Sequence, residues 1–142
     1  MENVSPPAGI SDLNALLAQI SPVLDPACYV YITLGAGSDA FSGPCRLRFR
    51  EAEGETLVIT REAAHAAGLA FTYPCRMITL SVASALDAVG FLAAVTTRLA
   101  SAGISVNPVS AYHHDYLFIA EQDADKAMDM LADLSASKAK DA

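Results

Sequence analysis

The segment from Ser110 to Ile119, SAYHHDYLFI, places two adjacent histidines, an aspartate and two tyrosines directly before an apolar run. Imidazole and carboxylate groups could bind a metal ion or act as general bases. Neighbouring side chains of a strand point to opposite faces, so His113 and His114 could not both bind one metal ion from a strand. No metal signature such as H-E-x-x-H occurs, and the remaining histidine, His65, belongs to a different element. We therefore expect no metal or other cofactor, and we interpret this segment as a turn at a sheet end, beside a ligand groove.

The composition limits the classes of partner. The 142 residues suit one ordinary domain or two very small ones, and 53% of them are hydrophobic, so the chain is expected to fold. The formal net charge of −7 would repel a phosphate backbone or an anionic lipid surface. Nucleic acid and membrane are therefore not expected as partners, whereas a small zwitterion or another protein remains open.

Three features bear on the cellular location. The N-terminal sequence MENVSPPAGI has neither the basic region nor the apolar region of a secretory signal. The longest mixed apolar stretch, residues 86–104, contains Asp87 and Arg98, so it is not expected to span a membrane. The three cysteines are widely spaced and form no C-x-x-C motif, which favours reduced thiols. Together these features predict a cytoplasmic protein.

The first half of the chain predicts a helix, a strand, a hairpin and a second helix. ISDLNALLAQI is amphipathic and is expected to form a helix capped by Ser11. CYVYITL, residues 28–34, is rich in strand-forming residues. The hairpin is expected to join strands at 46–51 and 56–60, and REAAHAAG is expected to form a short helix after it.

The second half predicts the order β-α-β-β-α, after a boundary at TYPC. RMITLSV alternates apolar and polar residues, as a half-buried strand does, and FLAAVTTRLASAG is a helix stopped by Gly103. ISVNPV and YLFIA are strands, and Pro108 indicates that the first of them is an edge strand or a bulged one. DADKAMDMLADL is a final helix started by Asp123, and SASKAKDA is expected to be a frayed tail.

Two strand-to-helix junctions have similar sequences. LVITREAAHAAG begins at Leu57, and LFIAEQDADKAM begins at Leu117, 60 residues later. Each runs from an apolar strand into an alanine-rich acidic helix. The similarity indicates two related units, although any strand-to-helix junction could produce it.

Residues 76–131, from RMITLSV to DADKAMDML, resemble the ACT domain, the small regulatory module of amino-acid metabolism. The parts follow in order: a strand, a D-x-x-G loop from Asp87 to Gly90, a helix with the pattern GFLAAV…LASAGISV, a hairpin and a second helix. GFLAAV is similar to the effector-binding segment of aspartate kinase regulatory domains. ISVNPVSAYHHDYLFIAEQD and CRLRFREAEGETLVITREAAHAAGL are similar to hairpins of the cytosolic arginine sensors of the CASTOR family.

The resemblance implies an α+β fold of tandem ACT-like units, each ferredoxin-like (βαββαβ), with an antiparallel sheet and helices on one face. It divides the chain into a degenerate N-terminal ACT-like unit, residues 1–72, and a C-terminal ACT domain, residues 73–142, within one fused body. An ACT domain usually ends in a strand after its second helix, and SASKAKDA is a poor candidate for it. The second unit is therefore expected to borrow a strand from the N-terminal half.

The resemblance also implies an amino-acid site between the D-x-x-G loop and the following hairpin. The first N–H groups of the helix lack partners and attract a carboxylate, and Gly90 lets a ligand approach the backbone. Asn107 and Asp115 are candidates to bind the ammonium, but Asn107 could equally cap a strand end, and Asp115 could be a turn residue. The expected ligand-binding residues are Ser84, Asp87, Val89, Gly90, Phe91, Leu92, Asn107, Tyr112 and Asp115.

These observations lead us to expect a non-catalytic regulatory protein of bacterial type. It would bind a free amino acid, form a homodimer and act on a metabolic enzyme. Two alternatives remain open. The first is a ligand-free structural module that dimerises and regulates a partner enzyme, and the second is a small metal-dependent hydrolase using His113, His114 and Asp115.

Overall fold

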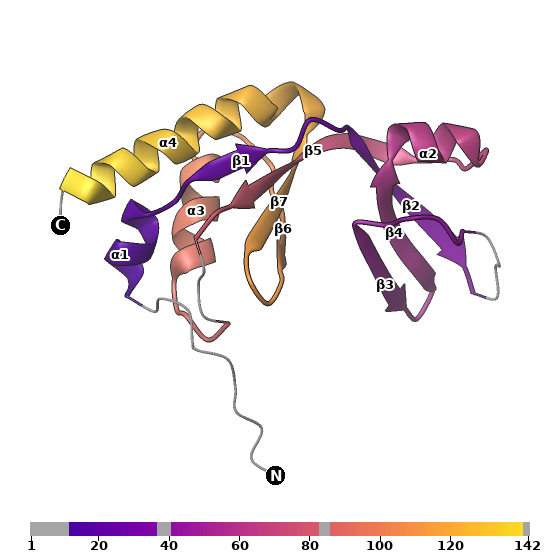
Figure 1. Cartoon of the computed structure of the whole chain (residues 1–142), viewed down its shortest axis with the longest axis horizontal. Helices are drawn as coiled ribbons and strands as arrows, with labels where there is room; N and C mark the ends of the chain where they lie inside the picture. The colour runs from indigo at the N-terminus through magenta and orange to yellow at the C-terminus, as the bar shows by residue number, and fades with distance from the viewer. Residues whose placement is uncertain (1–11, 37–40, 83–85, 141–142) are drawn as a thin grey trace, which may run out of the picture.

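The computed structural model describes residues 12–36, 41–82 and 86–140. In these residues, seven strands form one antiparallel sheet with the order β3-β4-β2-β5-β7-β6, and β1 pairs with β5 beside this path (Figure 1). The strands are β1 (Pro22–Leu24), β2 (Tyr29–Gly35), β3 (Leu47–Glu51), β4 (Gly54–Thr60), β5 (Thr72–Leu80), β6 (Asn107–Ser110) and β7 (Asp115–Ala120). The helices are α1 (Leu13–Ala18), α2 (Arg61–Ala66), α3 (Phe91–Ala100) and α4 (Ala124–Lys140), with a 3₁₀ turn, η1 (Glu121–Asp123), before α4.

The described helices all cover the same face of the sheet. On this face Val30 and Ile32 of β2 pack in one apolar cluster with Ala64 of α2. Further along the sheet, Ile78 and Leu80 of β5 pack in a larger cluster beneath α1, α3 and α4. The register of β2 and β5 pairs Tyr29 with Cys75, so Val30 and Ile78 point to the same side. The expected α+β fold with an antiparallel sheet and helices on one face is therefore confirmed.

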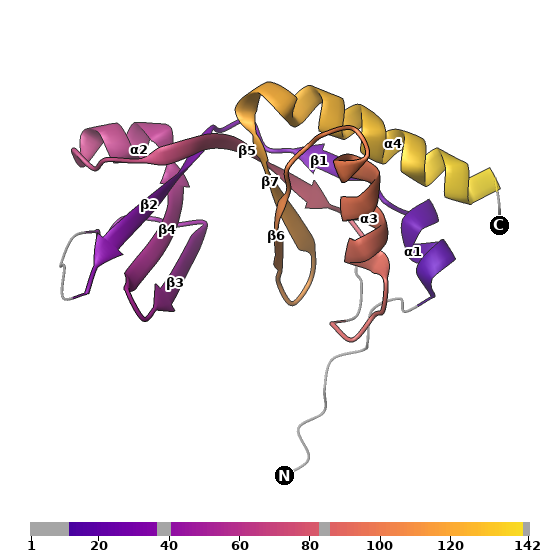
Figure 2. The same cartoon turned by 180° about the vertical axis from the view of Figure 1, so that it is seen from behind.

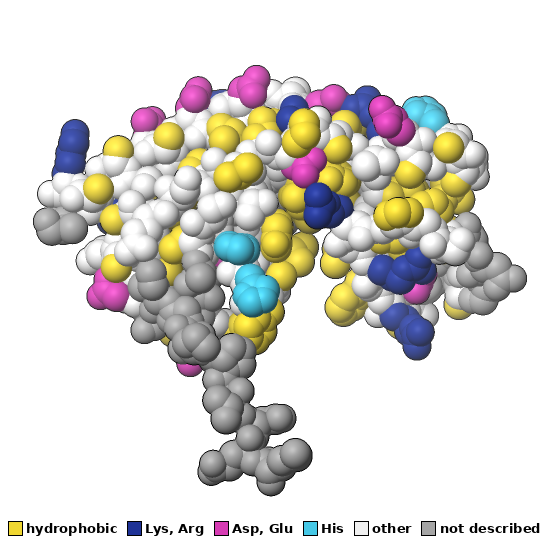
Figure 3. Space-filling model, viewed as in Figure 1, with side chains coloured by type: hydrophobic (Ala, Val, Ile, Leu, Met, Phe, Trp, Pro, Cys, Tyr) yellow, Lys and Arg dark blue, Asp and Glu magenta, His cyan; other side chains and the backbone are white. Residues whose placement is uncertain are grey.

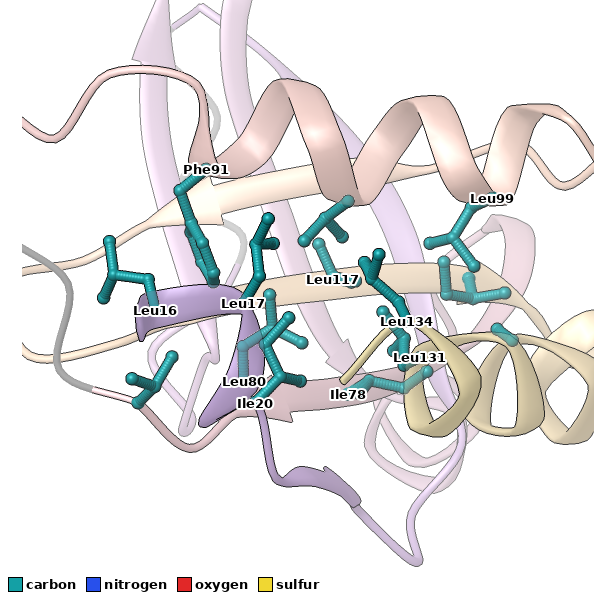
Figure 4. Packing of buried hydrophobic residues seen from close by; sticks show 14 of the residues in the cluster. Leu16, Leu17, Ile20, Ile78, Leu80, Phe91, Leu99, Leu117, Leu131 and Leu134 are labelled. Atoms are coloured by element: carbon teal, nitrogen blue, oxygen red, sulfur yellow. The ribbon is translucent and has the colours of Figure 1, made fainter. Parts of the chain in front are cut away.

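The N-terminal residues pack with the C-terminal half of the chain. Leu16, Leu17 and Ile20 are buried among side chains of β5, α3, β7 and α4 (Figure 4). Ser135 of α4 donates a hydrogen bond from its hydroxyl to the carbonyl of Ala18, 2.9 Å away. The strand β1 then pairs antiparallel with the end of β5. The expectation that the second unit borrows a strand from the N-terminal half is therefore confirmed.

The strand β5 belongs to both halves of the sheet. Cys75 pairs with Tyr29 of β2 on one side and with Ala120 of β7 on the other. The expected boundary after residue 72 therefore falls at the start of a continuous strand, and the division into residues 1–72 and 73–142 stays a prediction.

Several boundaries differ from those expected; β5 begins already at Thr72, α3 ends at Ala100, and three further differences have a clear physical reason. The cap of α1 is Asp12, whose carboxylate accepts from the N–H of Ala15, and not Ser11, which lies outside the described residues. The strand β6 begins only at Asn107, because Ile104 is buried and its N–H bonds to the carbonyl of Leu99 at the end of α3. The segment SASKAKDA was expected to fray, but α4 continues to Lys140, because its last turns pack on α1 and carry lysines at the negative end of the helix dipole.

The face of the sheet without helices carries an aromatic cluster. Tyr29, Met77 and Phe118 are buried there, and Tyr31 and Tyr116 pack against them. The sheet arches around this face, so the hairpin β3–β4 and the hairpin β6–β7 both extend from the same side of the molecule, with a hollow between them (Figures 1 and 3). None of the described helices has the length and apolar character needed to cross a membrane.

Candidate functional site

A groove lies at the start of α3, beside the hairpin formed by β6 and β7. Seen from behind, this hairpin stands next to α3 (Figure 2). The groove has a volume of about 140 Å³. We call it the α3 groove, and its described lining is Leu86, Ala88, Gly90, Phe91, Leu92, Ala93, Ser110, Ala111 and Asp115.

Asp115 gives the α3 groove a negative charge. Among the described residues it is the only charged side chain that is buried, at 5% exposure. The register of the hairpin pairs it with Ser110, whose hydroxyl donates a 2.7 Å hydrogen bond to Asp115 Oδ1. The N–H of Ala111 donates to the carbonyl of His114, which closes the turn between the two strands. The hairpin thus holds the carboxylate in a fixed position at the groove.

The first turn of α3 gives the opposite side of the groove a positive character. A helix of this length presents several N–H groups without intrahelical partners, together with the positive end of the helix dipole. The N-cap residue is Gly90, which has no side chain to bond these N–H groups. Its own carbonyl accepts from Ala94, which closes the first turn. One side of the groove therefore offers N–H groups that can bind a carboxylate, and the other side offers a carboxylate that can bind an ammonium.

The backbone at Gly90 explains why glycine stands there. Its φ is 91°, in the left-handed region that residues with a Cβ avoid. A Cβ added at this position would lie 3.3 Å from Leu13 Cδ2, so α1 packs closely behind the N-terminus of α3. A side chain at this position would therefore be strained by the backbone conformation and would have to displace the end of the Leu13 side chain slightly.

The expected ligand-binding residues divide into three groups. Gly90, Phe91, Leu92 and Asp115 line the α3 groove together. Asp87 and Val89 are exposed in the loop before α3, and Tyr112 is exposed in the hairpin turn; none of these three lines the groove. Ser84 lies outside the described residues.

Asn107 lies on the other face of the sheet. It pairs with Phe118, which belongs to the aromatic cluster of the helix-free face, whereas Asp115 pairs with Leu80 beneath the helices. The two candidates to bind an ammonium are therefore separated by the sheet, and only Asp115 reaches the groove.

Sequence reasoning did not select Ser110, although it lies in the segment SAYHHDYLFI. The signal that could have found it is the length of the turn. Four residues, 111–114, separate β6 from β7, and this spacing sets Ser110 directly opposite Asp115. A hydroxyl opposite a carboxylate on one face is a pair that can hydrogen-bond.

The two adjacent histidines lie in the turn of the hairpin and not in a strand. His113 is exposed, and its ring meets that of Tyr112 edge-on with centroids 5.0 Å apart. In the described part of the chain, no three His, Cys, Asp or Glu side chains come together in a way that could hold a metal ion.

Two family models match the chain, and both describe an ACT domain. One matches residues 8–76 and the other residues 72–133, so together they span most of the sequence. None of the curated proteins matches the chain.

Solved structures resemble the whole fold. A Vibrio cholerae protein of unknown function, described as a possible transport protein, is 40% identical, with a TM-score of 0.78 over 87% of this chain and 95% of its own. A protein from Agrobacterium tumefaciens is 20% identical, with a TM-score of 0.67 over 82% of this chain and 90% of its own. The ligand-free regulatory subunit of aspartate kinase from Thermus thermophilus is 8% identical, with a TM-score of 0.58 over 82% of this chain and 98% of its own. At identities this low, the last two likenesses concern the fold alone.

Proposed function

The chain belongs to the ACT domain family, and we propose that it is a non-catalytic regulatory protein that binds one free amino acid in the α3 groove. One juxtaposition supports this proposal: the N-terminus of α3 and the buried carboxylate of Asp115 line the same groove. An α-amino acid carries a carboxylate and an ammonium on the same carbon atom. The carboxylate would accept hydrogen bonds from the free N–H groups of α3, and the ammonium would donate to Asp115.

The lining also favours a particular kind of side chain on the ligand. The groove is small, with a volume of about 140 Å³. Apart from Asp115, the described lining residues are uncharged, so no second ionic partner is offered to a basic or acidic side chain. We therefore propose an amino acid with a short, uncharged side chain.

Self-association would place the groove near a subunit interface. Three apolar side chains around its mouth are strongly exposed: Val89 at 85%, Leu86 at 67% and Tyr112 at 54%. Exposed apolar groups that gather in one region favour contact with another protein surface. We propose a two-fold homodimer, the commonest geometry for a self-complementary contact. The same observation favours the second candidate function, a ligand-free module that dimerises and regulates a partner enzyme.

Regulation would follow from a difference in affinity between two arrangements of the subunits or of a partner. An amino acid that bound one arrangement more tightly would shift the population toward it, and only to the extent of that difference.

The experiment that tests the proposal is a thermal-unfolding screen with each of the twenty amino acids, followed by calorimetry with the strongest hit. A ligand present at one hundred times its dissociation constant should raise the free energy of unfolding by about 2.7 kcal/mol. Two derivatives of the hit serve as matched controls. N-acetylation removes the ammonium and esterification removes the carboxylate, so each should weaken binding by about ten-fold or more.

Two outcomes would contradict the proposal. If none of the twenty amino acids raised the unfolding temperature, the ligand-free module would become the better account, and light scattering that gave a dimer mass would favour it. If the N-acetyl derivative bound as tightly as the parent amino acid, Asp115 would not be the partner of the ammonium.

A further inference from the structure

A second hollow lies at the edge of β2, where the pairing of β2 with β5 ends, and none of its described lining residues lines the α3 groove. Two of its lining residues, Ile32 and Phe71, belong to the apolar cluster beneath α2. Its floor is formed by Tyr31, Thr33 and Thr56, its wall is formed by residues 70–72, and its volume is about 280 Å³. Thr33 and Thr56 stand directly opposite each other in the register of β2 and β4, and Tyr31 lies two residues before Thr33. The three side chains therefore share one face. We call this feature the tyrosine hollow.

The lining of the tyrosine hollow indicates what kind of molecule fits it. Every described residue that lines it is uncharged, and four of the seven carry a hydroxyl group. Burial raises the pKa of Tyr31 to about 12, so its hydroxyl stays neutral at physiological pH and can both donate and accept. A charged group placed there would lose hydration without meeting an opposite charge.

Tyr73 lies beside the tyrosine hollow and is unusual in two independent ways. Its φ is 57°, in the left-handed region that bulky side chains avoid. Its hydroxyl is buried and has no hydrogen-bond partner among the described residues. Strained residues and unpaired buried polar groups both reduce stability, and both are concentrated at functional sites.

The contacts of Tyr73 connect it to the hollow. It directly follows Thr72, which lines the hollow, and its ring meets that of Tyr31 edge-on with centroids 5.7 Å apart. The pairing of β2 with β5 shifts register between Tyr29 and Tyr31, at the same place. The strain, the unpaired hydroxyl and the irregular pairing thus occur together at one side of the hollow.

We propose that the tyrosine hollow binds a small uncharged molecule with an apolar body and a hydrogen-bonding group. The apolar body lies on the rings of Tyr31 and Phe71. The polar group bonds to the threonine hydroxyls that line the hollow. The same uncharged lining disfavours a zwitterion, so this ligand differs in class from the amino acid proposed for the α3 groove.

Three compounds that share one ring test the proposal: benzamide, which is neutral and hydrogen-bonding, benzoate, which is an anion, and benzylammonium, which is a cation. The readout is the NMR spectrum of the full chain with ¹³C in its tyrosine rings, since each of the five tyrosines gives its own signal. Benzamide should shift the signals of Tyr31 and Tyr73 and leave that of the exposed Tyr112 unchanged. The two charged compounds should bind about ten-fold more weakly or not at all.

Two variants test whether benzamide binds in the tyrosine hollow. Ala70 is exposed, so Ala70→Phe should fold normally while its ring fills the space and abolishes the shifts. Thr33→Val keeps the shape of the side chain but removes a hydroxyl that lines the hollow, so it should weaken benzamide binding about three-fold or more.

The proposal fails if benzamide at about 10 mM, a concentration that detects even weak binding, shifts neither Tyr31 nor Tyr73. It fails equally if all three ring compounds bind alike, or if Ala70→Phe binds benzamide as the parent chain does.

Discussion

Arg61 and Glu121 occupy matching positions in the two halves of the molecule, and their side chains form an ion pair with each other. Each is the first residue after a strand, Arg61 after β4 and Glu121 after β7. The two residues are 60 positions apart, which is the offset between the two similar strand-to-helix junctions in the sequence. Arg61 Nη2 lies 2.7 Å from Glu121 Oε1. The junctions therefore meet across β2 and β5, the two strands that lie between β4 and β7 in the sheet.

Reversing this ion pair should measure how strongly it holds the two halves together. Arg61→Glu places two acidic groups in contact and should lower the unfolding temperature, and the double variant Arg61→Glu/Glu121→Arg should recover part of the loss. Both side chains are partly exposed, so the effects should be small and should fade in high salt. Thermal unfolding of the three proteins at low and high salt gives the answer. If the difference in unfolding temperature between the single and the double variant were the same at low and at high salt, the effect would not be electrostatic.

Gly90 and Gly103 lie at the two ends of α3 and offer a matched test of the α3 groove. Both have positive φ, 91° and 73°, so an alanine at either position should cost about 1–2 kcal/mol of stability. Only Gly90 lines the groove, so only Gly90→Ala should also weaken binding of the amino acid found in the thermal screen. Calorimetry of both variants decides the matter. Equal losses of affinity in the two would mean that strain in α3, and not access to the backbone, controls binding.

Asp115→Asn should weaken amino-acid binding, because an amide oxygen carries no full negative charge to pair with an ammonium. The expected loss is about 1.5–3 kcal/mol, or roughly ten-fold or more in the dissociation constant. Asp125→Asn makes the same chemical change at an exposed position on α4 and should leave the affinity unaltered. Calorimetric dissociation constants for the two variants provide the comparison, and similar values for both would remove Asp115 from the site.

Leu17→Ala should destabilise the whole protein, although it lies near one end of the described chain. Leu17 is 1% exposed and shares a cluster with residues of β5, α3 and α4, so the expected loss is about 2–5 kcal/mol. Phe49→Ala removes a larger side chain that is 61% exposed and should change stability much less. Urea unfolding measures both. Two separate transitions in Leu17→Ala would indicate that α1 unfolds by itself, against the shared core seen here.

Tyr31 should make stability fall at high pH. Its pKa in the folded chain is about 12, because of burial, whereas an unfolded tyrosine ionises near the ordinary value of 10.0. Between these values the folded chain holds the proton more tightly, so its stabilising contribution is complete below pH 10 and is lost as the pH rises toward 12. Tyr31→Phe should show a flatter dependence of stability on pH in this range, and Tyr112→Phe should follow the parent chain. Unfolding midpoints from pH 9 to pH 12 supply the measurement.

The elements of the chain were largely predictable because their signals are local. The alternation of Ile78 and Leu80 with polar residues marks β5, and α3 ends at Ala100, three residues before the expected stop at Gly103. Pro108 was expected to place its strand at a sheet edge or at a bulge, and β6 is an edge strand. Helix ends were less well predicted, because the cap at Asp12 and the extension of α4 to Lys140 depend on contacts between segments distant in sequence.

The candidate site was predictable only in part, because its geometry depends on which residues of the hairpin point to which face of the sheet. Asn107 and Ser110 are three positions apart on one strand, so they point to opposite faces. Which of them faces the helices is set by the register with β7, and the register is set by a four-residue turn whose conformation the sequence alone does not specify. The conformation of Tyr73 could not be predicted at all. Nothing in TYPC indicates its positive φ, since the residue before a proline favours extended backbone.

The packing of α1 against α4 has a consequence for the order in which the chain can fold during synthesis. The hydrogen bond from Ser135 to Ala18 spans 117 positions, so α1 cannot make this contact until α4 has been translated. Meanwhile β2, β3 and β4 lie close together in the sequence and can pair early. At the ribosome, therefore, Leu16 and Leu17 lack the part of their core that α4 supplies until translation reaches that helix, and a chaperone that binds apolar segments could bind them in that interval.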